Sequence, residues 1–290
     1  MSILTTSYQI PPLTKKFDTQ VTLPGSKSIA LRQLAISALV DGKTILSGIP
    51  ECDDIDAMIE CLGTLGVRIQ RTKNELEISG PIDLSDKTVS INTRMSGAST
   101  RILIGLAALR KGLTRIDGHE SLRKRTNEPL LKTLEQMGCI VKREGVGLPV
   151  EISGPVISPE LEIAGNISSQ YVTALLLISP FLNQEDSVAI KIKGDLVSKP
   201  YIDITVNEMR KRGLRVRWNG SRDLVIESGA YSDGEYSIEG DATAASYFSA
   251  LATIHNSSVN FPNLGSNTVQ GDYFFFEVME QLGAKVERTE

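Results

Sequence analysis

At residues 24–28 the chain reads Pro-Gly-Ser-Lys-Ser, and an apolar segment rich in Ala and Leu follows directly. Similar openings of small polar residues precede apolar segments at 95–99 (Met-Ser-Gly-Ala-Ser), 166–170 (Asn-Ile-Ser-Ser-Gln) and 240–244 (Gly-Asp-Ala-Thr-Ala). Such openings are typical of helix starts, where backbone N–H groups without an intrahelical partner attract anions. The sequence therefore predicts a repeated unit whose helix starts, taken together, hold a small polyanion.

The ends of the copies repeat as well. Each copy closes its second helix with a glycine, at Gly66, Gly138, Gly213 and Gly283, so the spacing is 70 to 75 residues. This spacing suits a supersecondary unit of several elements, in the order helix, strand, helix, strand, strand, with a further strand leading in. We therefore expect an α/β fold of repeated units, with three complete copies and a fourth that stops before its closing strand.

Hydrophobic periodicity and turn residues predict the elements of each copy. The expected buried helices are 28–40, 102–110, 171–181 and 244–253, and the expected amphipathic helices are 53–65, 127–137, 202–212 and 274–282. Strands are expected at 43–47, 67–71, 75–79, 258–261 and 285–288. The first 22 residues belong to no copy, and Tyr8, Ile10, Val21 and Leu23 suggest edge strands that pair elsewhere.

The composition restricts the class of protein. The chain has 290 residues and a net charge of -4, which argues against a general nucleic-acid binder. Three scattered cysteines, and a start without a basic and apolar leader, predict a reduced cytoplasmic protein. The longest apolar run, 171–182, is too short to span a membrane. The two histidines lack the spacing of a metal site, so we expect no metal.

Polar and cationic side chains stand at the predicted helix starts. Ser28 is expected to cap its helix, and Arg32, one turn further on the same face, to reach a carboxylate or phosphate. The other candidates are Lys27, the cationic run Arg123-Lys124-Arg125, the helix start Ser168-Ser169-Gln170 and the run Ser198-Lys199-Pro200-Tyr201. Taken alone, each also fits an ordinary helix cap or a solvated loop, and both interpretations stay open.

A binding site requires that several of these polar and cationic clusters lie close together in the folded chain. One helix start contributes at most about 2 kcal/mol to anion binding, and a hydrogen bond to a charged group about 1.5–3 kcal/mol. Micromolar affinity requires about 8 kcal/mol, so three or four clusters must meet.

The acidic run Asp53-Asp54-Ile55-Asp56 is expected to stabilise a helix start rather than to bind metal. The stretch around Lys27 lacks the first glycine of a nucleotide-binding P-loop.

Five motifs, in order and at matching spacing, resemble the 5-enolpyruvylshikimate-3-phosphate synthase family. They are Leu23-Pro24-Gly25-Ser26-Lys27-Ser28 with Arg32, Ser168-Ser169-Gln170, Ser198-Lys199-Pro200-Tyr201-Ile202-Asp203-Ile204-Thr205, Glu239-Gly240-Asp241 and Gln270-Gly271-Asp272. The resemblance implies inverse α/β half-barrels built from βαβαββ units, with helix starts that face a cleft between two domains. It also implies transfer of the enolpyruvyl group of phosphoenolpyruvate to the 5-hydroxyl of shikimate 3-phosphate, a step of aromatic amino-acid biosynthesis.

The resemblance assigns roles to single residues. For shikimate 3-phosphate it implies that Ser168, Ser169 and Ser198 bind the phosphate, that Ser28 and Arg32 bind the carboxylate end, that Tyr201 packs beside it, and that Gln170 lies across the ring. For phosphoenolpyruvate it implies Lys27, Gly97, Arg125 and Gln170. Lys27 would contact both substrates and act as the catalytic residue, and no metal or organic cofactor is implied. Two neighbours depart from the family pattern: Met95-Ser96 replaces the usual Asn-Ala before Gly97, and Thr126 replaces the usual Pro after Arg125.

Members of this family are longer than this chain. We therefore expect a chain that lacks the C-terminal third, with residues 24–239 as one complete three-repeat domain and residues 1–23 with 240–290 as an incomplete second domain. Activity of this chain alone stays open, because a non-catalytic or complementing fragment would only bind shikimate 3-phosphate and would have a separate C-terminal piece as its partner. The other enzyme alternative, UDP-N-acetylglucosamine enolpyruvyl transferase, has Lys-Asn in place of Lys27-Ser28. Family members are usually monomeric, and we expect no nucleic-acid or membrane partner.

Overall fold

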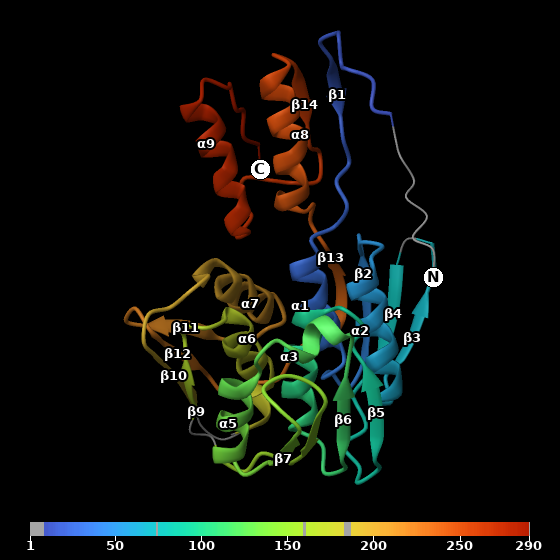
Figure 1. Cartoon of the computed structure of the whole chain (residues 1–290), viewed down its shortest axis with the longest axis vertical. Coiled ribbons are helices and arrows are strands. Elements are labelled where there is room, and N and C mark those ends of the chain that lie inside the picture. Colours follow the sequence, from blue (N-terminus) through green and yellow to red (C-terminus); the bar gives the residue numbers. More distant parts are fainter. Residues whose placement is uncertain (1–8, 74, 159–160, 183–186, 290) are drawn as a thin grey trace.

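The computed structural model describes residues 9–73, 75–158, 161–182 and 187–289. It has two parts, and Figure 1 shows them one above the other. The lower part holds the elements from α1 to β13, and the upper part holds β1, α8, β14, η2 and α9. The upper part is therefore built from both ends of the chain, with the blue strand β1 beside the orange strand β14.

Three four-stranded sheets of the lower part share one topology. Each begins with two parallel strands and ends with an antiparallel hairpin, in the orders β13-β2-β4-β3, β5-β6-β8-β7 and β9-β10-β12-β11. The strands are β2 (Lys43–Ser47), β3 (Arg68–Arg71), β4 (Glu75–Ser79), β5 (Val89–Asn92), β6 (Thr114–Asp117), β7 (Ile140–Arg143), β8 (Val150–Ser153), β9 (Leu161–Ala164), β10 (Val188–Lys193), β11 (Val216–Asn219), β12 (Asp223–Ile226) and β13 (Gly234–Ser237). The α/β fold of repeated units expected from the sequence is confirmed.

Each unit contributes one buried and one amphipathic helix. The buried helices are α1 (Lys27–Ser37), α3 (Gly97–Ala107) and α6 (Ser169–Ile178), the last continued by the short helix η1 (Ser179–Phe181). The amphipathic helices are α2 (Asp53–Thr64), α5 (Glu128–Gln136) and α7 (Lys199–Lys211). Because α1, α3 and α6 carry apolar residues on nearly all sides, they pack against one another at the centre and form the main core.

A strand from far along the chain completes the first unit. β13 pairs in parallel with β2, in the position that β5 and β9 take in the other two sheets. In the upper part β1 (Asp18–Gln20) also pairs in parallel with a strand far away in the sequence, β14 (Ser258–Asn260). The chain thus passes between the parts twice, and the two passages meet at a β-bridge between Gly25 and Gly240. A Cβ at Gly25 would lie 1.8 Å from the carbonyl oxygen of Gly48, so this approach requires glycine.

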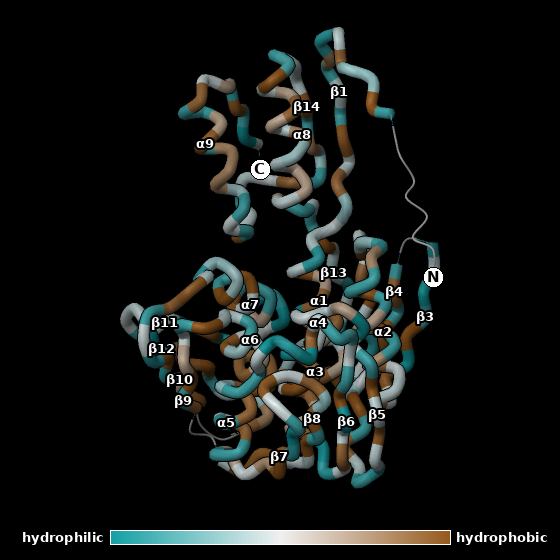
Figure 2. The backbone as a smooth tube through the Cα atoms, viewed as in Figure 1, coloured by the Kyte–Doolittle hydropathy of each residue, from teal (hydrophilic) through white to brown (hydrophobic). Residues whose placement is uncertain are grey.

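The upper part has a small core and an exposed apolar face. It consists of α8 (Ala242–Ile254), η2 (Gly271–Phe274) and α9 (Phe275–Gln281) beside the strand pair, and Leu23, Ala245 and Phe276 form its core. Brown, hydrophobic residues recur along α8 and α9 in Figure 2. On α8, Tyr247 and Ile254 are 73% and 79% exposed. Phe248 and Leu251 are exposed as well, so helical spacing places four apolar side chains along one side of α8.

Some expected elements differ from the structure. The strand expected at 285–288 is wrong, because no described strand pairs with 284–289. Ile10 lies in no strand, and Tyr8 falls outside the described residues. The helix expected from residue 102 begins five residues earlier, at Gly97. Arg123, the first residue of the cationic run, ends the short helix α4 (Glu120–Arg123), whose first turn is capped by His119 accepting from the N–H of Ser121.

Candidate functional site

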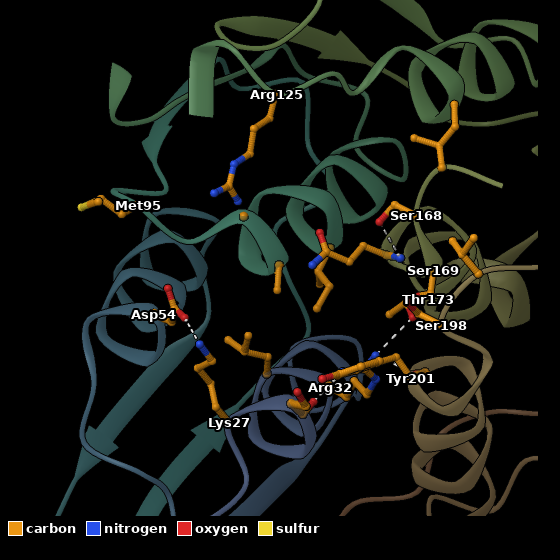
Figure 3. A pocket seen from close by; sticks show the side chains of 18 residues that line it. Lys27, Arg32, Asp54, Met95, Arg125, Ser168, Ser169, Thr173, Ser198 and Tyr201 are labelled. Carbon is orange, nitrogen blue, oxygen red and sulfur yellow. Dashed lines mark hydrogen bonds and ion pairs between the residues drawn. The ribbon is translucent and has the colours of Figure 1, made fainter. Parts of the chain in front are cut away.

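The N-terminal ends of α1, α2, α3, α6 and α7 converge on one cavity of about 500 Å³. All ten residues for which the resemblance implies a role line it: Lys27, Ser28, Arg32, Gly97, Arg125, Ser168, Ser169, Gln170, Ser198 and Tyr201. Figure 3 shows Lys27 and Arg125 reaching toward this space from opposite sides of the view. The opening of the fourth copy, 240–244, is not part of the lining, although the Asp241 carboxylate accepts from the backbone N–H of Lys27 at 3.3 Å.

Lys27 begins α1 and forms an ion pair across the cavity wall. Its ammonium lies 2.6 Å from the carboxylate of Asp54, in the first turn of α2 (Figure 3). The hydrogen bond with Asp54 raises the pKa of Lys27 above its ordinary value, against the opposing effect of burial. The side chains are 49% and 23% exposed, so the pair is in contact with solvent. An anion that entered the cavity would therefore compete with Asp54 for the ammonium.

Arg32 lies on α1 with its guanidinium buried below the cavity. It donates to the hydroxyls of Thr205 at 2.7 Å and Thr173 at 3.3 Å, and to the carbonyls of Ser28 at 2.6 Å and Tyr201 at 2.8 Å. Burial lowers the pKa of Arg32 to about 10, so it remains a cation at neutral pH. These bonds tie α1 to α6 and α7.

The expectation that Ser28 caps its helix is wrong. α1 begins at Lys27, and Ser26 occupies the N-cap position without a side-chain cap bond. The carbonyl of Ser28 instead accepts from Arg32, one turn further along. Because Ser28 lies inside the first turn, its side chain lines the cavity and does not close the helix end.

The starts of α6 and α7 bring hydroxyls to the cavity. The hydroxyl of Ser168 caps α6 by accepting from the N–H of Gln170 at 3.2 Å, as the structural interpretation of this run predicts. Ser198 precedes α7 with a φ of 55°, in the left-handed region that residues other than glycine seldom adopt. Pro200 follows in the first turn, where its fixed φ suits a helix start. Tyr201 is 39% exposed at the same end of the cavity.

Among the three cations at 123–125, only Arg125 lines the cavity. Arg123 pairs with Asp117 at 2.8 Å, and Lys124 pairs with Glu120 at 3.1 Å. The guanidinium of Arg125 makes no hydrogen bond or ion pair with the part of the chain that the structure describes. It is therefore available to an anion.

Gly97 lies between two guanidinium groups. A Cβ on Gly97 would come within 2.7 Å of Nη1 of Arg101 and 3.3 Å of Nη1 of Arg125. Arg101 is buried, and it donates to the carbonyl of Gly97 at 2.9 Å. This corner of the cavity thus combines a helix start with two cations, an arrangement that attracts anions.

A sequence profile described as EPSP synthase (3-phosphoshikimate 1-carboxyvinyltransferase) matches residues 13–290. The chain belongs to the EPSP synthase family. It is similar to the 3-phosphoshikimate 1-carboxyvinyltransferases of Shewanella pealeana, with 36% identity over 94% of this chain and 66% of the relative, and of Yersinia ruckeri, with 37% identity over 91% and 63%. It therefore spans a little less than two thirds of the length of these relatives.

A solved structure, that of EPSP synthase from Acinetobacter baumannii, has a similar fold. The TM-score is 0.80 at 24% identity, and the match covers 94% of this chain and 61% of that one. At this identity the likeness supports the fold alone. It agrees with the inverse α/β architecture that the family resemblance implies.

Eight further residues of this EPSP synthase family member line the cavity without a site role assigned from the sequence, although Met95, Ala98 and Ile167 lie in the predicted helix openings. They are Leu31, Asp54, Met95, Ala98, Ile102, Ile167, Thr173 and Val197. Helical spacing could have found two of them, since Leu31 and Thr173 each lie about one turn beyond a predicted site residue, Ser28 and Ser169. Asp54 could not be found in this way, because it comes from a different helix and its place in a first turn is explained by the macrodipole alone.

Among the described residues, no group of three or more His, Cys, Asp or Glu side chains could hold a metal ion. Within the same residues, no helix of this EPSP synthase family member combines the length and the apolar character needed to cross a bilayer.

Proposed function

We propose that the cavity binds shikimate 3-phosphate and phosphoenolpyruvate, and that the chain serves the transfer of the enolpyruvyl group to the 5-hydroxyl of shikimate 3-phosphate with release of phosphate. One observation supports this above all: cations and hydroxyls from three separate units line a single cavity. Membership of the EPSP synthase family agrees with it.

The proposed reaction is an addition followed by an elimination. The 5-hydroxyl oxygen forms a bond to C2 of phosphoenolpyruvate, the hydroxyl proton leaves, and C3 gains a proton. Loss of a proton from C3 and departure of phosphate from C2 then restore the double bond. Both substrates are polyanions that repel each other, so the positive charges of Lys27, Arg32 and Arg125 would offset this repulsion and hold the reacting atoms together.

We propose that the two substrates occupy different ends of the cavity. Ser168, Ser169 and Ser198 would hold the phosphate of shikimate 3-phosphate, and Ser28 and Arg32 its carboxylate end, with Tyr201 beside it. Gly97 and Arg125 would face phosphoenolpyruvate, and Gln170 would lie between the two. Lys27 would contact both and move a proton or stabilise charge at the reacting centre. The raised pKa of the Lys27 ammonium supports the charge-stabilising part of this role, because it leaves Lys27 a cation at neutral pH.

The binding half of this proposal can be tested with the chain itself. Shikimate 3-phosphate is expected to raise the melting temperature, and Ser169→Ala is expected to reduce that rise, because Ser169 lines the cavity and is buried. Ser153→Ala is the matched control, since this serine lies on β8 outside the cavity. No rise with the wild-type chain at millimolar ligand would contradict the proposed substrate.

A second candidate is binding without turnover. The exposed apolar face of α8, with Tyr247 and Ile254, favours a chain that works with a complementing piece over that face. Release of phosphate from the two substrates by the chain alone would exclude this candidate. Binding of shikimate 3-phosphate without phosphate release would support it.

Domain boundaries and location are also proposals. We infer one unit of residues 24–239 and another of 1–23 with 240–290, of which residues 1–8 and 290 lie outside the described residues. The bridge between Gly25 and Gly240, where the chain crosses from one unit to the other twice, supports these boundaries.

A cytoplasmic location is supported by three free cysteines, two of them buried, which is typical of a reducing compartment. We further infer a monomer, which sedimentation can test.

A further inference from the structure

The carbonyl of Thr126 joins three elements around the cavity. It accepts from the hydroxyl of Tyr171 at 2.7 Å and from Nη2 of Arg101 at 3.3 Å. Tyr171 lies on α6 directly after Gln170, and Arg101 lies on α3 one turn after Gly97. Thr126 itself follows Arg125 in the segment between α4 and α5. One acceptor therefore connects the two helix starts and the loop that carries the available cation.

Both donors are buried and Thr126 is partly buried, so water reaches these bonds only from the side of the acceptor. Tyr171 is 2% exposed and Arg101 is 6% exposed. A buried polar group that loses its partner carries the full cost of its desolvation. The Thr126 carbonyl is thus held more firmly than an exposed loop carbonyl would be.

The side chain of Thr126 fixes the same segment from the other direction. Its hydroxyl accepts from the N–H of Glu128 at 3.1 Å, at the start of α5. A proline at 126 would retain the carbonyl and lack the cap.

Arg125 needs such support because of a neighbouring like charge. The guanidinium groups of Arg101 and Arg125 both lie beside Gly97. Two cations beside the same residue repel each other unless an anion or fixed dipoles offset the repulsion. Arg101 has two backbone carbonyls as partners, those of Gly97 and Thr126, whereas Arg125 has no side-chain partner among the described residues. The backbone of 125–126 must therefore resist the repulsion when the cavity is empty.

We propose that Tyr171 is a positioning residue that, through the Thr126 carbonyl, holds Arg125 at the Gly97 end of the cavity for a phosphorylated three-carbon carboxylate. This inference rests on the proposed function, since it names the end that phosphoenolpyruvate would occupy. Tyr171 itself is not among the cavity-lining residues. Its action is on the backbone that carries Arg125.

The test removes the hydroxyl and compares two tyrosines. Tyr171→Phe deletes one donor, and Tyr231→Phe is the control, because Tyr231 is also buried and donates to a backbone carbonyl, that of Leu177, at 3.0 Å. The first readout needs no ligand: hydrogen exchange at the amides of Arg125 and Asn127, which donate to the carbonyls of Leu122 and Val146. We expect exchange about fivefold faster in Tyr171→Phe, the factor that corresponds to one hydrogen bond, and no change in Tyr231→Phe.

The second readout is ligand affinity measured by calorimetry on the whole chain. Tyr171→Phe is expected to weaken phosphoenolpyruvate binding about fivefold, measured with shikimate 3-phosphate present, and to leave shikimate 3-phosphate binding within about twofold. Unchanged exchange would overturn the positioning role, whatever the ligands do. Faster exchange with an equal loss of affinity for both ligands would show that Tyr171 does not act selectively on the phosphoenolpyruvate end of the cavity. If the wild-type chain bound neither ligand, the proposed function would fail, and the exchange experiment would still decide the role of Tyr171.

Discussion

The ammonium of Lys27 and the carboxylate of Asp54 meet at 2.6 Å on the wall of the cavity. They come from the first turns of two different helices, α1 and α2. The pair has two consequences: it raises the pKa of Lys27 further above the neutral range, and it places a negative charge in a cavity that otherwise favours anions. Asp54 therefore opposes the binding of anions that Lys27 favours.

Replacing this carboxylate is expected to tighten anion binding. In Asp54→Asn, inorganic phosphate no longer competes with a carboxylate for the Lys27 ammonium. A solvent-exposed ion pair contributes at most about 1 kcal/mol, so the affinity for phosphate should rise no more than about fivefold. Calorimetry at pH 7 and low salt measures it. Asp56→Asn is the control, because this residue lies in the same turn and pairs with Arg71. Weaker phosphate binding in Asp54→Asn would contradict the argument.

The same pair predicts a pH dependence of stability. The folded-state pKa of Lys27 is raised above 10.5, so the pair stabilises the fold below pH 10.5 and loses its contribution as the pH rises through the raised value. The free energy of unfolding of Asp54→Asn should therefore lie slightly below that of the wild type at pH 8, with the difference vanishing above the folded pKa. Urea titrations at several pH values test this. A difference independent of pH would count against it.

A methyl group at Gly97 is expected to disturb both neighbouring guanidinium groups. Gly97→Ala would place a Cβ within 2.7 Å of Arg101 and 3.3 Å of Arg125, so at least one cation must move. Affinity for phosphoenolpyruvate should fall about tenfold, the equivalent of roughly 1.4 kcal/mol. Gly63→Ala on α2 is the control, since a Cβ there meets nothing within 4 Å. Equal affinity in Gly97→Ala and the wild type would refute the expectation.

Arg32 is expected to matter for stability as well as for binding. Arg32→Ala removes four hydrogen bonds and leaves the hydroxyls of Thr173 and Thr205 without this donor, so we expect a loss of about 3 kcal/mol or more in the free energy of unfolding. Denaturant titration measures it. Arg71→Ala should cost less than about 1 kcal/mol, because its pair with Asp56 is exposed. Similar losses of unfolding free energy in the two variants would contradict the stabilising role of the buried hydrogen bonds of Arg32.

The three cysteines are expected to differ in reactivity. Burial raises the pKa of Cys61 to about 12 and of Cys139 to about 11, so both stay thiols at pH 8, and the thiolate is the reactive form. Cys52 is only half-buried. A disulfide reagent at pH 8 should therefore label one thiol per folded chain and three after denaturation. Rapid labelling of all three in the folded chain would contradict the burial of Cys61 and Cys139.

Much of the fold and of the site could be predicted from local patterns. The polar openings and closing glycines predict the helices and their order, and β2 and β4 fall at the predicted residues. Local patterns also identify the residues of the helix starts, because N–H groups at such starts and nearby cations suit anions wherever they occur. They could not identify Asp54, which acts on Lys27 of a different helix, or Tyr171, which acts on Thr126 of a different unit.

The sequence by itself determined the repeated unit, its helix starts and the side chains at them, because these depend on periodicity and capping over a few residues. The tertiary structure decided which strand completes which sheet and which helix starts face one another. β13 joins β2 across almost two hundred residues, and β1 joins β14 from the opposite end. Such pairings arise from burying the apolar faces of whole units, α1, α3 and α6 above all, and no local pattern specifies them.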